Sequence, residues 1–149
     1  MITLNFANLT LPLTRFAEGN YPRERLNPPE ISRSQWGTPL RTGTAYEAPH
    51  TWQISVYLSE DEADTLEAIY GAYIAAPAAV RVWDQARKYA EPSPRTRALV
   101  PGTSETAKGE QVLYFAQFNA EFSGPVSLGK AGNWRQATFT LVETFKVAA

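Results

Sequence analysis

The chain contains no cysteine among its 149 residues. Disulfide frameworks, thiolate nucleophiles and thiolate metal sites are therefore excluded. Histidine occurs once, at His50, which excludes multi-histidine metal sites and the HExxH motif of metalloproteases. The P-loop, the GxGxxG motif and the serine nucleophile elbow are missing as well. The sequence therefore predicts no metal, no cofactor and no enzyme activity.

Charged residues are also few, at 19% of the chain, and the formal net charge is −1. A dedicated nucleic-acid binder carries a strongly basic surface, so this balance argues against specific nucleic-acid recognition. No apolar run approaches the length of about 20 residues that a membrane-spanning helix needs. The first residues also lack the basic and apolar regions of a signal peptide. We therefore expect no membrane partner, and folding in the cytoplasm.

The chain is rich in aromatic and aliphatic residues, and many of them alternate with polar ones. In the segment His50–Leu58 every second residue from Trp52 onward is apolar, which indicates a half-buried strand. Ser59 and Glu62 then form a capping-box pattern, and apolar residues follow at helical spacing. The sequence therefore predicts a helix at about 60–74, within a chain of single-domain length.

Alternation of the same kind predicts most of the remaining architecture. Further strands are expected at Ile2–Phe6, Leu9–Leu13, Val80–Asp84, Gln111–Phe122 and Asn133–Val147. The last two predict a long antiparallel C-terminal hairpin (about 111–147). The side chains of Phe118, Phe122, Phe139 and Leu141 are expected to be buried between this hairpin and the rest of the sheet. We therefore expect one domain of α+β class, mainly β. It would be a β-sandwich or split barrel with the helix packed on one side.

Two long segments, 14–49 and 85–110, contain many prolines and show little periodicity. Both are predicted to be loops. Loops longer than about 12–15 residues are uncommon in compact domains and are usually functional or disordered. Because these segments offer few apolar anchors, we expect them to become ordered only when a neighbouring molecule supplies the missing surface.

Two groups of residues are candidates for chemistry. His50 could act as a general base, but the sequence assigns it no partner, so a structural role is favoured. The predicted helix carries a run of acids that could hold a hard cation or face a partner. These acids are Glu60, Asp61, Glu62, Asp64 and Glu67. The second reading is favoured because calcium ligands normally alternate along a loop rather than follow a helix.

Arginine supplies ten of the fourteen basic residues, and most of the arginines fall in the two predicted loops. They could be ordinary solvated residues. They could also contact nucleic acid, with Tyr21, Trp36 and Tyr89 stacking on bases, although the net charge argues against this. A third reading joins the basic loops of one copy to the acidic helix of the next, because arginine suits interface ion pairs. The candidate self-assembly residues are Glu62, Asp64, Glu67, Arg23, Arg25, Arg87, Arg95 and Arg97.

The order of the predicted elements from His50 onward suggests a family. The segment Trp52–Tyr70, WQISVYLSEDEADTLEAIY, is a strand that runs directly into a capped helix. It is followed by VRVWD at Val80–Asp84 and later by WRQATFTLVE. This order resembles that of tailed-phage tail-tip proteins, namely the lambda-type minor tail proteins and the N-terminal tube-like domain of distal tail proteins. The resemblance covers roughly His50–Val147. A proline-rich N-terminal region and the 85–110 insertion distinguish this chain from shorter members.

The resemblance implies a structural virion protein without catalytic residues. Proteins of that group assemble into rings, usually hexamers, that extend the tail tube or join it to the baseplate. For this chain it implies a homo-oligomeric ring at the virion tail tip, assembled in the host cytoplasm. Its partners would be further copies of itself, the tail tube and other tail-tip or baseplate-hub proteins. The lumen of such a ring could pass DNA without specific recognition.

The residues themselves leave a second function open, that of a small-molecule or carbohydrate-binding β-barrel. In that case Trp36, Trp52, Trp83 and Trp134 would line a concave pocket. An enzyme is the least favoured class. Oligomeric state separates the first two functions, since a ring subunit must assemble whereas a ligand-binding barrel can remain a monomer.

Overall fold

A computed structural model describes residues 1–17, 23–25, 30–33, 39–42, 49–89, 98–100, 105–106 and 112–144. These residues form one helix and a series of strands. In chain order they are β1 (Ile2–Phe6), β2 (Leu9–Leu13), β3 (Arg23–Arg25), β4 (Glu30–Arg33), β5 (Pro39–Thr42), β6 (His50–Leu58), α1 (Glu60–Ala75), β7 (Val80–Tyr89), β8 (Ala98–Leu99), β9 (Glu105–Thr106), β10 (Val112–Phe122), β11 (Ser127–Ala131) and β12 (Trp134–Glu143).

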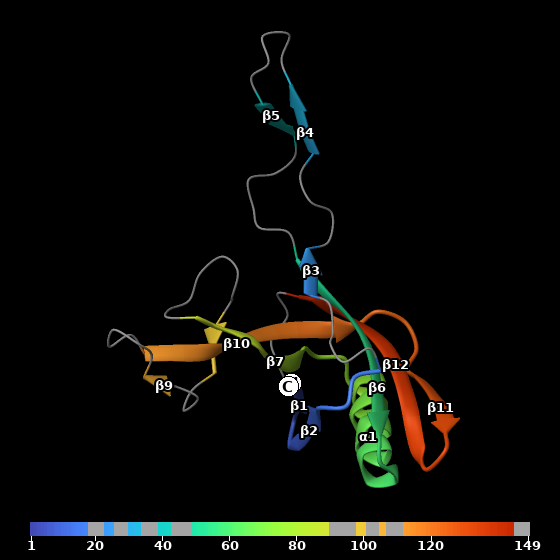
Figure 1. The fold of residues 1–149 in the computed structure, drawn as a ribbon. Helices are drawn as coiled ribbons and strands as arrows, with labels where there is room; N and C mark the ends of the chain where they lie inside the picture. The colour runs from blue at the N-terminus through green and yellow to red at the C-terminus, as the bar shows by residue number, and fades with distance from the viewer. Residues whose placement is uncertain are drawn as a thin grey trace.

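Most of the strands belong to one antiparallel sheet with the order β2-β1-β7-β10-β12-β6-β3. β11 extends this sheet beside β12, and β8 and β9 pair with β10. The sheet curls around a core, and α1 lies across its open side against β2, β12 and β6 (Figure 1). β4 and β5 pair with each other in a separate two-stranded sheet, which Figure 1 shows beyond the end of β3. The expected α+β, mainly β fold is thus confirmed.

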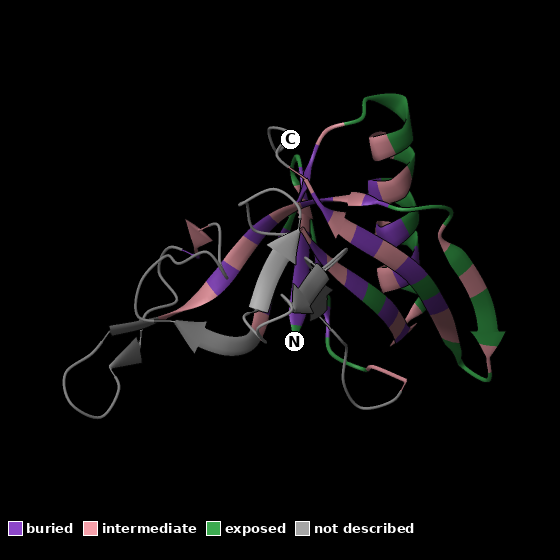
Figure 2. Cartoon of the chain, turned by 90° about the horizontal axis from the view of Figure 1, so that it is seen from above, coloured by how far each residue is buried: buried purple, intermediate pink, exposed green. Residues whose placement is uncertain are grey.

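The core lies between the inner face of the curled sheet and one face of α1, as the buried residues in Figure 2 show. Phe118, Phe122, Phe139 and Leu141 are all buried, which confirms the strand faces predicted from alternation. The helix contributes its own apolar stripe. The buried helical residues are Ala63, Leu66 and Ile69. Helix and sheet therefore bury the faces that their periodicities predict.

The start of α1 also agrees with the prediction. Ser59 has an extended backbone, with φ −70° and ψ 169°, and its side chain accepts a hydrogen bond from the Glu62 backbone N–H. This bond satisfies one of the backbone donors that have no partner inside the first turn of a helix. The helix runs one residue beyond the predicted range of 60–74, and Pro77 follows soon afterwards.

The C-terminal hairpin needs a correction. β10 and β12 are antiparallel neighbours as predicted, but they pair only from Ala120↔Glu143 to Phe122↔Leu141. On its other edge β12 pairs with β6, from Arg135↔Leu58 to Val142↔Thr51. The chain between β10 and β12 forms the unpredicted strand β11, which lies beside the first half of β12 in the place that the predicted hairpin gives to β10. The tight turn belongs to β11 and β12, where Gly132 adopts a φ of +62°. Positive φ is what a two-residue hairpin turn requires and glycine allows.

The two predicted loops also need correction. The segment 14–49 contains β3, β4 and β5, and the segment 85–110 contains the end of β7 together with β8 and β9. Apart from β7, these strands have two to four residues, which is too short for a period of two to be recognised. β7 continues past its expected end at Asp84. Its register against β10 shifts between Phe115 and Ala116, and this irregularity interrupts the alternation from which the strand was predicted. The expectation that these segments order on assembly stays a prediction.

Candidate functional site

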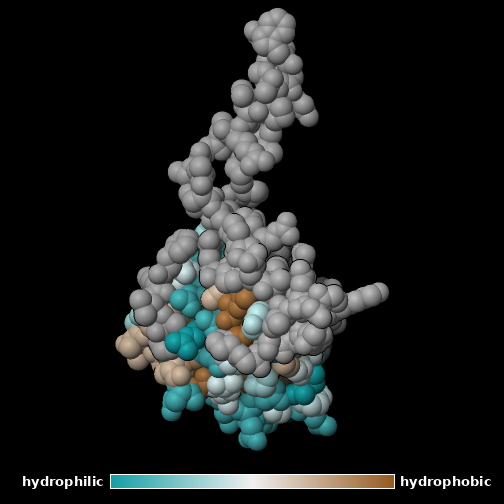
Figure 3. Space-filling model, turned by 90° about the vertical axis from the view of Figure 1, so that its left-hand side faces the viewer, coloured by the Kyte–Doolittle hydropathy of each residue, from teal (hydrophilic) through white to brown (hydrophobic). Residues whose placement is uncertain are grey.

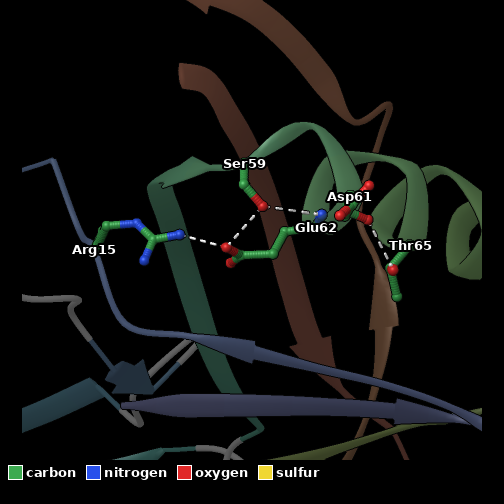
Figure 4. A network of polar contacts seen from close by, with 5 residues as sticks. All are labelled: Arg15, Ser59, Asp61, Glu62 and Thr65. Atoms are coloured by element: carbon green, nitrogen blue, oxygen red, sulfur yellow. Dashed lines mark hydrogen bonds and ion pairs between the residues drawn. The ribbon is translucent and has the colours of Figure 1, made fainter. Parts of the chain in front are cut away.

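A polar cluster joins Arg15 to the start of α1 (Figure 4). The Ser59 hydroxyl donates to Glu62 Oε1 at 3.0 Å and accepts from the Glu62 backbone N–H at 3.3 Å. The guanidinium of Arg15 donates to the same Glu62 oxygen and forms an ion pair with it. Arg15 reaches this position because residues 15–17 extend along β6, where the Tyr57 N–H donates to the Arg15 carbonyl at 2.8 Å. Glu62 is therefore held by contacts within its own chain.

The first turn of α1 is also tied to the start of β12. Arg135 Nε donates to Glu60 Oε1 at 3.2 Å, and the Arg15 guanidinium lies 4.4 Å from the centroid of the Trp134 ring. These side chains are largely exposed, so each ion pair contributes at most about 1 kcal/mol. Together they fasten the helix to the β11–β12 hairpin, and two of its five acids are used in doing so.

Replacing Ser59 by alanine is expected to lower the free energy of unfolding by about 1 kcal/mol, because an N-terminal amide of α1 loses its acceptor. Ser59→Thr keeps that acceptor and serves as the matched control. Chemical denaturation of the three proteins measures the difference. Equal midpoints for the alanine variant and the wild type would show that the cap contributes nothing to stability.

The outer face of α1 is uncovered in the part of the chain that the structure describes. Its N-terminal half carries the exposed acids Asp64 and Glu67, and its C-terminal half carries exposed small or apolar residues. The latter are Ala68, Gly71, Ile74 and Ala75. Ile74 is 59% exposed, the largest exposure among the described large hydrophobic residues. Within the helix no lysine or arginine offsets its five acids.

The basic half of the predicted interface cannot be matched to these acids. Arg23 and Arg25 lie in β3, and Arg87 lies in β7, where only the backbone is described. Arg95 and Arg97 fall outside the described residues. Of the predicted acids, Glu62 is engaged by Arg15, whereas Asp64 and Glu67 face solvent. The interface itself stays a prediction.

Large hydrophobic side chains are scarce on the surface that the structure describes. Those that are exposed are Met1, Ile74 and Trp134. On the face shown in Figure 3 much of the described surface is hydrophilic, and the most hydrophobic side chains gather mainly in a small central area. A contact made by this surface would therefore include many polar and charged groups.

The three tryptophans that the structure describes do not converge on one pocket. Trp52 is fully buried in the core. Trp83 lies on the opposite face of the sheet, where its Nε1 donates to Gln117 Oε1 at 3.0 Å. Trp134 is 42% exposed at the β11–β12 turn beneath Arg15. Trp36 lies outside the described residues. The three described tryptophans thus occupy different environments.

A buried polar cluster at one end of the core was not predicted. His50 and Glu143 lie on adjacent strands, and His50 Nδ1 is 2.8 Å from Glu143 Oε2. Trp52 Nε1 donates to Asp84 Oδ2 at 3.2 Å. Phe118 packs beside this group, with its ring centroid 4.9 Å from that of His50 and 5.1 Å from that of Trp52. The side chains of His50 and Glu143 are only 5% and 0% exposed.

The partner of His50 had a sequence signal. Glu143 continues the apolar face of Ala137, Phe139 and Leu141, and Asp84 continues that of Val80 and Val82. A carboxylate on a buried face needs a hydrogen-bonding partner, because an unpaired buried charge is strongly unfavourable. Burial leaves this pair no access to a substrate. The favoured structural role of His50 is therefore the one that its geometry supports.

No three acidic or histidine side chains are grouped so as to hold a metal ion within the described residues. Among those same residues, α1 is neither long nor apolar enough to span a membrane. Comparisons with protein-family models, curated proteins and solved structures found no match.

Proposed function

We propose that the chain is a structural protein that assembles into a ring in the tail tip or baseplate hub of a tailed phage. The observation that carries this proposal is the β6–α1–β7 unit, in which a strand runs directly into a capped helix and the chain then returns to the same sheet. That unit has the element order on which the resemblance to tail-tip proteins rests. Its helix presents an acidic, uncovered outer face.

The distribution of charge supports assembly of identical copies. The acids are concentrated on α1, whereas arginines are concentrated in the segments 15–41 and 81–97. Contacts between two different surfaces of one protein are heterologous, and they close into a ring when the rotation between neighbours permits. A hexamer is the expected closed form. Its place would be the virion tail tip, with the tail tube and other tail-tip proteins as neighbours and a lumen that passes DNA.

Negative-stain electron microscopy of the purified chain tests this function. We expect ring-shaped particles with an open lumen and sixfold symmetry, in a fraction that grows with protein concentration. A control sample in high salt should contain fewer rings, because exposed charges are screened beyond a few ångströms at about 1 M ionic strength. A chain that remains monomeric at every attainable concentration would contradict the proposal and would favour a ligand-binding module.

A further inference from the structure

The two-stranded sheet formed by β4 and β5 has few contacts with the other helices and strands that the structure describes. β4 and β5 contact each other extensively, and no other described element contacts them to a comparable extent. Figure 1 shows this small sheet beyond β3, away from α1. An isolated pair of strands is at best marginally stable in water, and packing against a helix or further strands is what stabilises it. A surface supplied by a neighbouring molecule would therefore stabilise the small sheet.

The outer face of α1 is such a surface. Ala68, Gly71 and Ala75 lie about one turn apart on its exposed side, next to Ile74. A glycine inside a helix costs about 1 kcal/mol relative to alanine. Gly71 does not have a positive φ, and a Cβ placed on it would meet nothing within 4 Å. Packing among the described residues does not explain this glycine, but close approach of a neighbouring backbone would.

Charge also favours contact between the outer face of α1 and the region of the small sheet. α1 carries five acids and no basic residue. The β3–β5 region, residues 23–42, contains Arg23, Arg25, Arg33 and Arg41 against two glutamates. Two of the helix acids, Asp64 and Glu67, lie on the outer face beside the small residues, outside the ion pairs that hold Glu60 and Glu62. A helix face of this sign suits a basic strand pair.

We propose that the β4–β5 sheet of one copy docks on the outer face of α1 of the next copy. This inference rests on the proposed ring function and names the contact that builds the ring. Each copy contributes two different surfaces, so the contact is heterologous and can repeat until the ring closes. The small sheet gains the helix that it lacks, and Asp64 and Glu67 gain arginine partners.

The absence of native cysteine allows a direct test with two single-cysteine variants. Ser32→Cys places a thiol in β4, and Ala68→Cys places one on the outer face of α1. One variant carries a size tag, and the two are mixed and oxidised. A disulfide forms only when the two Cα atoms approach to within about 7 Å, so the mixture should yield a mixed dimer. Because each chain has one thiol, a small sheet folded onto its own helix cannot produce this product.

The matched control replaces Ala68→Cys by Ser127→Cys, which places an exposed thiol in β11. Mixed dimers from the Ser32 and Ala68 variants that exceed this control by about tenfold or more support the docking. Equal yields in the two mixtures would overturn it, as would mixed dimers in the control alone.

Self-association provides the second readout. Ala68→Arg adds a bulky cation to the proposed docking face, whereas Gln53→Arg adds one to the exposed side of β6. In sedimentation velocity, Ala68→Arg should weaken assembly at least about tenfold and Gln53→Arg should not. Rings that persist in Ala68→Arg, together with no excess of mixed dimer over the control in the cysteine experiment, would overturn this contact while leaving the ring function standing. A wild type that never self-associates would overturn both proposals.

Discussion

Replacing Glu143 by alanine is expected to destabilise the fold by about 3–5 kcal/mol. The Glu143 side chain is fully buried, and its Oε2 lies 2.8 Å from His50 Nδ1 across the β6–β12 pair. Removing Glu143 takes this buried hydrogen bond from His50, and the lost hydration of a buried polar group is not recovered. Chemical denaturation of the single variant measures the loss.

The pairing between Glu143 and His50 is isolated by a double-mutant cycle. His50→Ala and Glu143→Ala should together cost less than the sum of the single changes, because each single change already breaks the hydrogen bond between the two side chains. An apolar replacement of both residues, His50→Phe with Glu143→Leu, should be milder still. Thr138→Ala, at an exposed position of the same strand, serves as the control and should change stability little. Additive single effects would show that the two side chains do not stabilise one another.

Phe118→Ala is expected to cost about 3–5 kcal/mol, the range typical of truncating a buried aromatic side chain. Phe118 is 1% exposed in the centre of β10, and its ring packs edge-on against Trp52. The loss combines the removed apolar surface with the cavity that the rigid strands on either side cannot close. Thermal or chemical unfolding measures it, and Phe118→Leu, which fills most of the volume, should lose less.

The outcome that would contradict this prediction is wild-type stability in Phe118→Ala. Successive residues of a strand point to opposite faces, so a one-residue slip would move Phe118 to the solvent side and bring Gln117 inside. Unchanged stability would therefore mean that the two faces of β10 are exchanged. With the faces exchanged, Phe118 would also no longer pack beside the His50–Glu143 pair.

Local sequence patterns were sufficient for β6 and α1. The alternation from Trp52 to Leu58 and the Ser59–Glu62 pair depend on near neighbours, and both features are present as expected. The pairing of β12 was harder to predict, because its alternation defines which face is buried but not which strand lies beside it. The chain after Phe122 turns through Gly124, with a φ of +92°, and forms β11 before it reaches β12. β11 therefore takes the place beside the first half of β12 that a direct hairpin would give to β10.

In the candidate site, too, some features follow from the local sequence and others depend on contacts between distant residues. The acidic character of α1 was evident from the sequence, but which acids remain available depends on Arg15 and Arg135, which lie 47 and 75 residues from their partners. Residues 15–17 reach the helix only because they extend along β6, a tertiary contact without a local signal. By contrast, Glu143 and Asp84 interrupt apolar alternation, and that interruption could have predicted a buried polar cluster.

The central claim is that identical copies of this chain form a closed ring through the outer face of α1. Native mass spectrometry of the wild type and of Ala68→Arg, at equal concentration, tests it most directly. We predict one dominant closed species in the wild type, expected to be a hexamer, and its loss to monomer in Ala68→Arg. A wild type that is monomeric, or the same closed species in both proteins, would contradict the claim.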